Sequence, residues 1–278
     1  MTPQKSINIK GSLLDLSVPR VMGILNVTPD SFYKGSRISS TDEVLLKAEG
    51  MINDGATFLD IGGYSTRPGS IDISEEEELQ RTIPIIEALR KTFPEVYLSI
   101  DSFRSGVAKR AVEAGADLVN DISCGELDGE MLGIVGTLGV PYVGMHMRGT
   151  PQTMSKLTNY EDLVGEVAKY FALKSKKVEE AGIKDFIIDP GFGFAKTKEQ
   201  NFELLNQLEF LNQLGFTTLC GVSRKSMIYK SLNVTAEEAL NGTTVLNTVA
   251  LLKGVSVLRV HDVKEAIEAI KLINLLQN

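Results

Sequence analysis

The sequence is poor in the side chains that form disulfides, zinc sites and hydrolytic triads. Its 278 residues contain no tryptophan, two cysteines and two histidines. Cys124 and Cys220 do not have the spacing of a metal site, and one pair of thiols does not make a disulfide framework. Neither His146 nor His261 stands in a motif with a serine or cysteine nucleophile, and we expect His146 to pack or to line a pocket. A disulfide framework, a structural zinc site and a triad hydrolase are therefore all disfavoured.

Positive charge and long apolar runs are also scarce. The formal net charge is −7, which argues against a nucleic acid or an anionic membrane as a partner, because both need a basic face. No stretch approaches the roughly 20 apolar residues of a membrane span. Residues 1–10 lack the apolar core of a signal peptide. The sequence therefore predicts a cytoplasmic protein with no nucleic-acid or membrane partner.

Short apolar runs, in contrast, recur regularly along the chain. They have strand length, they alternate with helical patterns, and 43% of the residues are hydrophobic, which is enough for a large core. Six glycines end a helical pattern just before a strand, an order typical of parallel α/β proteins. Because eight parallel strands close a barrel, the sequence predicts one domain over residues 1–278, a single (β/α)8 TIM barrel. The predicted strands are 21–27, 57–63, 97–102, 118–123, 141–147, 186–189, 218–223 and 255–261, and the glycines are Gly55, Gly115, Gly139, Gly182, Gly215 and Gly254.

An N-terminal β-hairpin is predicted ahead of the first barrel strand. Residues 7–9 and 13–16 are mainly apolar and flank Lys10-Gly11, a pair suited to a tight turn. This hairpin could cover the lower mouth of the barrel.

Two helix starts can also be predicted. Thr41 is expected to open the helix that ends at Gly55. Ser74 and Glu77 have the spacing of a capping box, and acids are favoured at the N-terminal end of a helix dipole. We interpret Glu75–Glu78 as a solvated helix start with no functional role.

Polar side chains end several predicted strands, where a parallel barrel gathers its functional groups on one face. Asp101, Asn120 and Asp189 end three different strands in apolar surroundings. A carboxylate accepts two parallel hydrogen bonds, so this set suits a planar heterocycle with paired N–H donors. Metal binding and the capping of turns are the competing interpretations. Lys225 is predicted beside Asp189, where it could donate to a ring nitrogen or carbonyl, although a lysine at a strand end is commonly just solvated.

The same face offers two places for anions. Residues 223–226 are predicted to open the helix after the seventh strand, where free N–H groups attract an anion and a generic barrel holds a phosphate. Arg67, Arg259 and His261 suit a second anion, since arginine can contact phosphate oxygens in a bidentate way. Asn26 could give an oxygen to Mg²⁺, which binds jointly to a protein and a diphosphate. We therefore expect a site for one heterocycle and two anionic groups.

These motifs resemble those of the dihydropteroate synthases, pterin-binding TIM-barrel enzymes of the folate pathway. Eight segments match in the family's order across nearly the whole chain, and several of them are long, which argues against a chance match. The matching segments are Met22–Phe32, Asp60–Gly69, Ser99–Ser102, Asn120–Ile122, Met145–Met154, Asp189–Phe194, Ser223–Ile228 and Arg259–Val263.

The resemblance implies a transferase that joins p-aminobenzoate to 6-hydroxymethyl-7,8-dihydropterin diphosphate, giving 7,8-dihydropteroate and diphosphate. It also implies a Mg²⁺ cofactor, a homodimer and a target of sulfonamides, which mimic p-aminobenzoate. Residues are implied to bind the three parts of the substrates as follows: the pterin by Asp101, Asn120, Met145, Asp189 and Lys225; the diphosphate by Asn26, Arg67, Arg259 and His261, with Asn26 also at the metal; and p-aminobenzoate by Thr66, Pro68, Phe194, Lys225 and Ser226. The generic phosphate position of the barrel thereby becomes a carboxylate site.

The implied chemistry needs no protein nucleophile. The bond from the pterin methylene to diphosphate weakens as charge builds on the leaving oxygens, and Mg²⁺ with the arginines and His261 would stabilise that charge in the transition state. The family is thought to pass through a cation-like methylene that the amine captures. The catalytic set implied by the resemblance is Asn26, Arg67, Lys225, Arg259 and His261.

Two positions depart from the family pattern. The family commonly continues its first loop with Ser-Asp-Gly-Gly, whereas Phe32 is followed here by Tyr33-Lys34-Gly35, so a cation replaces the loop acid. We hypothesise that Lys34 helps to neutralise the diphosphate. In the second loop, Tyr64 stands where a glutamate is common.

Two alternatives share part of this pattern. A pterin-binding methyltransferase that uses methyltetrahydrofolate would keep the pterin-facing Asp and Asn, but it has little use for residues 65–68 or for the Arg-x-His pair. A non-catalytic pterin-binding paralogue would lose a residue of the anion sites, and none of those residues is missing here.

Overall fold

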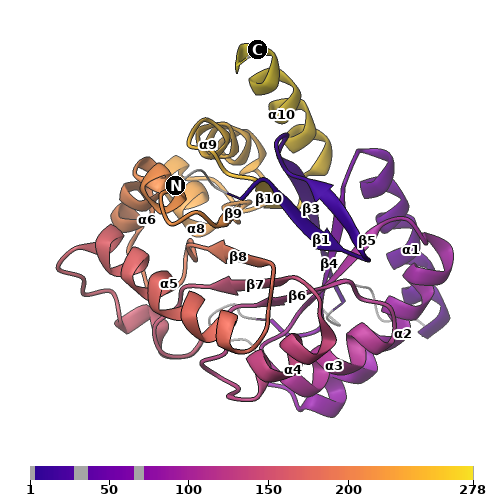
Figure 1. The fold of residues 1–278 in the computed structure, drawn as a ribbon. Helices are drawn as coiled ribbons and strands as arrows, with labels where there is room; N and C mark the ends of the chain where they lie inside the picture. Colours follow the sequence, from indigo (N-terminus) through magenta and orange to yellow (C-terminus); the bar gives the residue numbers. More distant parts are fainter. Residues whose placement is uncertain (1–3, 28–36, 66–71, 278) are drawn as a thin grey trace.

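Eight parallel strands close into a barrel in the computed structural model, which describes residues 4–27, 37–65 and 72–277. Neighbours in the barrel follow the order of the chain, and the last strand pairs with the first. Helices surround the strands (Figure 1). The strands are β3 (Arg20–Asn26), β4 (Phe58–Gly62), β5 (Tyr97–Asp101), β6 (Leu118–Asp121), β7 (Tyr142–Met145), β8 (Phe186–Asp189), β9 (Thr217–Cys220) and β10 (Val257–Val260). The predicted TIM barrel is confirmed.

At least one helix follows each barrel strand, as the alternating pattern predicts. Gly139 ends α4 in the left-handed conformation with φ 67°, and the other five glycines predicted to end helices also have positive φ. The helices are α1 (Arg37–Asn53), α2 (Glu75–Thr92), α3 (Ser105–Glu113), α4 (Met131–Leu138), α5 (Leu163–Glu180), α6 (Lys198–Asn206), α7 (Leu208–Asn212), α8 (Ser226–Leu232), α9 (Leu240–Leu252) and α10 (Val263–Gln277), with the short 3₁₀ turn η2 (Met154–Lys156) before α5.

The N-terminal hairpin is confirmed and covers one mouth of the barrel. Strands β1 (Ser6–Ile9) and β2 (Ser12–Asp15) pair antiparallel, and Lys10 and Gly11 have the positive φ values that a two-residue turn needs. Ile7 and Ile9 pack on Met22 and Phe58 near the N-terminal ends of the barrel strands. Each buried isoleucine contributes about 1.5–3 kcal/mol. The hairpin thus fills the N-terminal mouth and leaves the C-terminal mouth for a site.

Helix α1 begins earlier than the sequence predicts. It starts at Arg37 rather than at Thr41, so the predicted start is wrong by four residues. No proline or glycine stands between these positions to stop the helix, and a threonine alone does not fix its first turn.

The glutamate run at the start of α2 is only partly solvated. Ser74 caps the helix as predicted, since its Oγ accepts from the backbone N of Glu77 at 3.1 Å. Glu78, however, is 0% exposed, so the prediction of a fully solvated run is wrong at this residue. Glu78 shares the buried face of α2 with Thr82 and Ile86, one and two turns along. The packing of this face against the barrel turns Glu78 into a core carboxylate.

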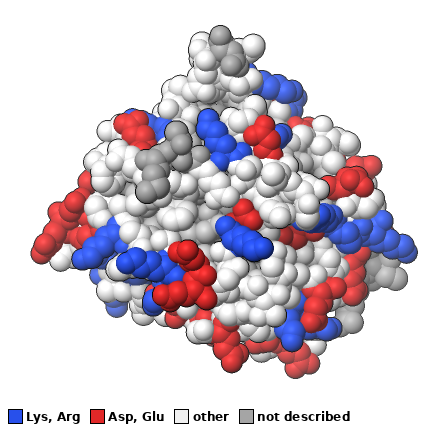
Figure 2. Space-filling model, viewed as in Figure 1, with Lys and Arg blue, Asp and Glu red and all other residues white. Residues whose placement is uncertain are grey.

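Figure 2 shows acidic and basic side chains interspersed on one face, which therefore has no extended patch of positive charge. In the described part of the chain, none of the helices combines the length and the apolar character that crossing a membrane requires.

Candidate active site

One arginine joins two aspartates at the C-terminal mouth of the barrel. Arg259 on β10 donates from Nε to Oδ2 of Asp60 on β4 at 2.6 Å. Its Nη2 donates to Oδ2 of Asp101, at the end of β5, at 2.5 Å. Asn120 on β6 donates from Nδ2 to the same Asp60 oxygen at 2.9 Å. Three predicted site residues from three strands therefore belong to one hydrogen-bonded cluster.

Asp60, at the centre of this cluster, was not among the predicted site residues. It is 0% exposed, and its Oδ1 has no hydrogen-bond partner among the described residues. A buried carboxylate is costly unless it is paired, so Arg259 and Asn120 stabilise its charge. The signal that could have found it is a lone acid inside the apolar run of β4.

Burial makes the two strand-end aspartates more basic than usual. It raises the pKa of Asp101 to about 7, although the charge of Arg259 opposes the shift and that of Asp60 adds to it. Burial also raises the pKa of Asp189, against the charge of Lys225. The side chain of Asp101 is 20% exposed, so a ligand in the mouth can reach it. Such carboxylates are strong acceptors for paired N–H donors.

Asp189 and Arg259 approach each other beside a glycine. A Cβ on Gly221 would lie 3.9 Å from Oδ2 of Asp189 and 3.9 Å from Cβ of Arg259. The missing side chain therefore keeps the centre of the mouth open between β8 and β10.

Lys225 stands at the edge of this opening as the N-cap residue of α8. Its Nζ donates to the carbonyl of Phe192 and lies 4.7 Å from the centre of the Phe194 ring. Burial lowers the pKa of Lys225 to about 8, and the charge of Asp189 opposes this shift. The structure thus brings Asp189, Phe194 and Lys225 together, with Ser226 as the first residue of α8.

A buried lysine, which the sequence did not single out, holds the loop that carries Phe194. Nζ of Lys196 donates to the carbonyls of Gly191 and Phe194 and lies 3.0 Å from Nδ1 of His146. Burial lowers the pKa of His146 to about 2, so its neutral ring accepts from the ammonium group. His146 is 3% exposed, which confirms that it packs.

An apolar wall lies next to these charged groups. Met145 is buried at the end of β7, and a Cβ on Gly191 would lie 3.2 Å from its Cγ. The wall is a small cluster of buried residues with three partly buried ones against it, namely Ile122, Met145, Met147, Met154 and Ala195 with Phe103, Leu127 and Phe194. An apolar wall beside carboxylates suits a flat polar ring.

His261 is held by a neighbouring hydroxyl. Its Nδ1 lies 3.0 Å from Oγ of Ser223, which also accepts from the backbone N of His261 at 3.1 Å. Burial and the charge of Arg259 lower the pKa of His261 to about 4, so the ring is neutral near pH 7. When Nδ1 accepts from Ser223, Nε2–H is free to donate to an anion.

Asn26 ends β3 beside a space that a side chain would fill. A Cβ on Gly62 would lie 3.5 Å from Oδ1 of Asn26. Among the described residues, no group of three or more His, Cys, Asp or Glu side chains could hold a metal ion. One amide oxygen at an open position fits a Mg²⁺ ion that arrives with a diphosphate, since Mg²⁺ keeps waters and binds jointly to substrate oxygens.

Several predicted residues lie outside the described part of the chain. Thr66, Arg67, Pro68 and Lys34 are among them. Arg259, which is predicted to hold the diphosphate, uses Nε and Nη2 to donate hydrogen bonds to Asp60 and Asp101. The roles assigned to individual site residues stay predictions.

Comparison with known proteins agrees with the geometry of the mouth. The family of pterin binding enzymes matches residues 22–261. Among curated relatives, the dihydropteroate synthase of Escherichia coli K12 is 43% identical over 266 residues, which are 95% of this chain and 94% of the relative. The Synechocystis dihydropteroate synthase is 45% identical over 259 residues, 92% of this chain and 89% of that protein.

Solved structures agree with the sequence relatives. A Yersinia pestis dihydropteroate synthase in a sulfonamide drug complex superposes with a TM-score of 0.92 at 40% identity, over 98% of this chain and 99% of that one. A Xanthomonas albilineans dihydropteroate synthase in complex with 7,8-dihydropteroate gives a TM-score of 0.88 at 35% identity, over 98% of each chain.

The barrel and the polar groups at its C-terminal mouth are those of a pterin-binding enzyme. Within that class, the chain belongs to the dihydropteroate synthase family and is a transferase. This result disfavours both alternatives left open by the sequence, the methyltransferase and the non-catalytic paralogue.

Proposed function

We propose that this chain condenses 6-hydroxymethyl-7,8-dihydropterin diphosphate with p-aminobenzoate to give 7,8-dihydropteroate and diphosphate. The supporting observation is the joint position of Asp101, Asn120 and Asp189 beside Lys225 in a chain 43% identical to a dihydropteroate synthase over 266 residues. Ionised carboxylates at two strand ends accept from the paired N–H groups of a pterin. The apolar wall beside them covers the face of the ring.

The reaction breaks one bond and forms one. The carbon–oxygen bond from the pterin methylene to diphosphate breaks, and its electron pair leaves with the diphosphate. The amine nitrogen of p-aminobenzoate forms the new bond to that carbon and releases one proton to the solvent. The Nε2–H of neutral His261 donates to the leaving oxygens, and Phe194 and Lys225 border the aromatic acid, whose carboxylate lies at the start of α8.

Asn26 is the residue that we propose for the metal. Its amide oxygen would hold Mg²⁺ together with the diphosphate, and the bound ion would supply positive charge to the leaving oxygens. Titration of Mg²⁺ against the affinity for dihydropterin diphosphate tests this role. We expect Asn26→Ala to weaken the dependence of affinity on Mg²⁺, whereas an unchanged dependence would contradict it.

Two aspartates at opposite ends of β8 provide a matched test of the activity. Asp189 ends β8 at the open mouth, whereas Asp185 lies just before β8 at the other end and accepts from Nε2 of Gln4 at 3.1 Å. We expect Asp189→Asn to lower kcat/KM by about a hundredfold and Asp185→Asn to change it little. Product is measured as dihydropteroate formed from the two substrates with Mg²⁺. No product with the unmodified chain would overturn the proposed function.

Sulfonamides provide a second test of the p-aminobenzoate position. The Yersinia pestis relative was solved with a sulfonamide drug. We expect a sulfonamide to raise the apparent KM for p-aminobenzoate without changing kcat. Inhibition that p-aminobenzoate does not relieve would contradict the placement of the acid beside Phe194 and Lys225.

Lys34, which replaces the acid of the family's first loop, keeps its proposed role in neutralising the diphosphate. We expect Lys34→Ala to lower kcat/KM and to increase the dependence of the rate on Mg²⁺. If both stay unchanged, this role is wrong.

The assembly and location of the chain belong to the same proposal. We propose a cytoplasmic homodimer, and the apolar side chains of Val245 and Leu252 on α9, both more than half exposed, support a covered surface there. Light scattering measures the mass in solution. Val245→Lys is expected to shift the population toward monomer, and a monomeric unmodified chain would contradict the dimer.

A further inference from the structure

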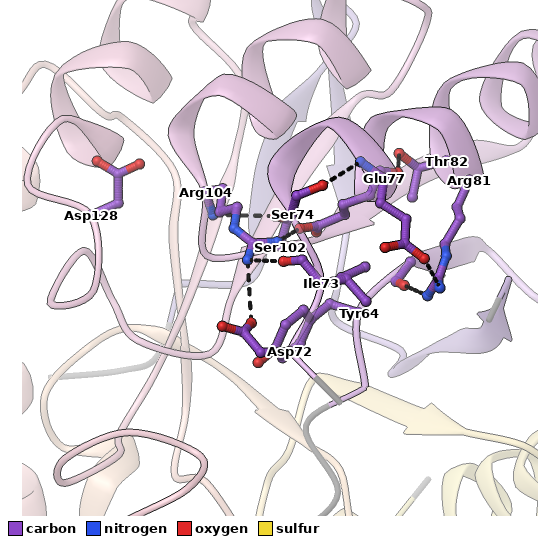
Figure 3. Close-up of polar contacts among 12 residues, drawn as sticks. Tyr64, Asp72, Ile73, Ser74, Glu77, Arg81, Thr82, Ser102, Arg104 and Asp128 are labelled. Atoms are coloured by element: carbon purple, nitrogen blue, oxygen red, sulfur yellow. Dashed lines mark hydrogen bonds and ion pairs between the residues drawn. The ribbon is translucent and has the colours of Figure 1, made fainter. Parts of the chain in front are cut away.

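Arg104 connects three elements beside the pterin-facing strand ends. It lies three residues after Asp101, and its Nη1 donates to Oε2 of Glu78 on α2. Its Nη2 donates to the carbonyl of Ile73 at 2.6 Å and lies 3.5 Å from Oδ1 of Asp72. Figure 3 shows the guanidinium between Ser102, Ile73 and Asp72, next to Tyr64. One side chain thereby ties the loop after β5 to α2 and to the chain that enters it.

The ion pair is buried at its acidic end. Glu78 is 0% exposed and the side chain of Arg104 is 16% exposed. Burial raises the pKa of Glu78, while Ser102 and Arg104 oppose the shift. Arg104 is therefore the cation that compensates a core carboxylate, a stronger requirement than that of a surface pair.

Aromatic rings complete the contact on the other side. The ring of Tyr64 packs edge-on against that of Phe103, with 5.1 Å between the centres. The guanidinium carbon of Arg104 lies 5.3 Å from the Tyr64 ring and 5.0 Å from the Phe103 ring. Tyr64 is the residue that replaces the glutamate common in the family. In this chain the guanidinium of Arg104 therefore makes a cation–π contact with an aromatic ring at that position, in addition to its ion pair with Glu78.

The contacts of Arg104 lie on both sides of a segment that matters for the reaction. Tyr64 precedes and Ile73 follows the stretch that carries Arg67, a predicted ligand of the diphosphate. A neighbouring bond adds to this anchoring, since Arg81 donates to the carbonyl of Gly63 at 3.0 Å. Holding both ends of a loop lowers the entropy that its residues lose when they bind a ligand.

We propose that Arg104 is a positioning residue that holds Tyr64 and Ile73, the described residues on either side of the stretch that carries Arg67, and thereby favours binding of the diphosphate part of the pterin substrate. The inference rests on the proposed function and deepens it. Arg104 acts through other residues and has no contact with the reacting atoms.

A pair of ligands separates this role from general stability. Dihydropterin diphosphate contains the group that Arg67 is predicted to bind, whereas the alcohol 6-hydroxymethyl-7,8-dihydropterin lacks it. Calorimetry with Mg²⁺ present, at a pH well above the pKa of Asp101 so that its carboxylate is ionised in each variant, gives both affinities. We expect Arg104→Met to weaken the diphosphate ester about tenfold and the alcohol less than twofold.

A double variant keeps the test informative if the single variant is too unstable. Arg104→Met leaves Glu78 buried without its cation, whereas Glu78→Gln/Arg104→Met removes both charges and restores much of the stability. The double variant still lacks the bond to Ile73, so we expect it to keep the selective loss of ester affinity. Arg104→Lys keeps the positive charge, but a lysine cannot reproduce the simultaneous bonds of the guanidinium to Glu78 and to the carbonyl of Ile73. Compared with Arg104→Met, we expect it to restore stability and only part of the ester affinity.

Arg148→Met is the matched control. Arg148 pairs with Glu166, donates to the carbonyl of Asn159 and stacks on Tyr160, but it lies in the loop after β7. We expect it to leave the ratio of the two affinities unchanged. Equal loss of ester and alcohol affinity in the Arg104 variants, or an unchanged double variant, would overturn the inference. If the unmodified chain fails to bind the ester, the proposed function falls and this inference falls with it.

Discussion

Arg104 and Arg148 make the same kinds of contact at two places around the barrel mouth. Each pairs with a glutamate in the first turn of a helix, each donates to a loop carbonyl, and each lies over a tyrosine ring. They differ in burial. Glu78 is 0% exposed and Glu166 is 35% exposed. Similar contacts therefore differ in energetic importance, because water can replace the partner of Glu166 but not that of Glu78.

The two arginines also differ in what lies beside them. The charge of Glu78 acts on Asp101 and raises its pKa. Glu166 and Arg148 instead line a cleft of about 970 Å³ between α5 and the segments that follow β6 and β7, together with Glu126, Lys169 and Tyr170. The arrangement near Arg104 thus affects the candidate site through the charge of Glu78, whereas Arg148 mainly holds the loop after β7.

The largest expected difference is in stability. Arg104→Met leaves a buried carboxylate without its cation, so we expect the free energy of unfolding to fall by about 3–5 kcal/mol. Arg148→Met breaks an ion pair in contact with solvent, and we expect a small fraction of that loss. Urea denaturation of both variants measures the difference. Equal losses would show that burial does not distinguish the two arginines.

The next largest effect is expected at Lys196, a buried cation in the loop after β8. Its three donors all find acceptors, at His146, Gly191 and Phe194. Lys196→Met leaves the Phe194 carbonyl without this donor, at a cost of about 1–3 kcal/mol, whereas the Gly191 carbonyl still accepts from the backbone N of Phe194 at 3.1 Å. Because the loop carries Phe194, we expect KM for p-aminobenzoate to rise several-fold while the affinity for the pterin alcohol stays nearly constant. If KM for p-aminobenzoate rises and the affinity for the pterin alcohol falls by a similar factor, Lys196 stabilises the fold and has no specific role at the p-aminobenzoate position.

A third effect is a pH shift at Asp101, whose pKa is raised by burial to about 7. Below that pH the carboxyl is protonated and no longer accepts two N–H bonds. Affinity for the pterin alcohol should therefore fall as pH drops through 7, by up to about tenfold per unit. In Arg104→Met the uncompensated charge of Glu78 should move the midpoint upward, whereas in Arg148→Met it should stay. Calorimetry between pH 5.5 and 8.5 measures both midpoints, and a midpoint unmoved in Arg104→Met would contradict the electrostatic link.

The sequence was sufficient to predict the barrel, because its signals are local and repeated. A glycine that ends a helix just before a strand, as at six places here, needs no knowledge of tertiary contacts, and the hairpin turn at Lys10-Gly11 depends only on backbone conformation. The strand-end residues Asp101, Asn120 and Asp189 were predicted because parallel strands bring their carboxyl ends to one face.

Residues that act through tertiary contacts were missed. Asp60 matters because Arg259, far away in the sequence, donates a hydrogen bond to it across the barrel mouth. No local sequence pattern predicts that the two residues are in contact. Glu78 could have been found, since its spacing to Thr82 and Ile86 follows the helical period, but the composition of the glutamate run obscured this. The pairing of Lys196 with His146 joins two loops and has no signature along the chain.

The smallest expected effect separates the ring of Tyr64 from its hydroxyl. Nε2 of Gln152 donates to that hydroxyl at 3.3 Å, a long hydrogen bond, whereas the ring contacts Phe103 and Arg104. Tyr64→Phe keeps the ring, so we expect kcat/KM and the free energy of unfolding to stay close to those of the unmodified chain. Tyr64→Ala removes the ring and should reproduce part of the selective loss of ester affinity that we expect for Arg104→Met. If Tyr64→Phe has the larger effect of the two, the hydroxyl rather than the aromatic contact connects this position to the site. The ring contacts of Arg104 with Tyr64 and of Arg148 with Tyr160 would then not be equivalent.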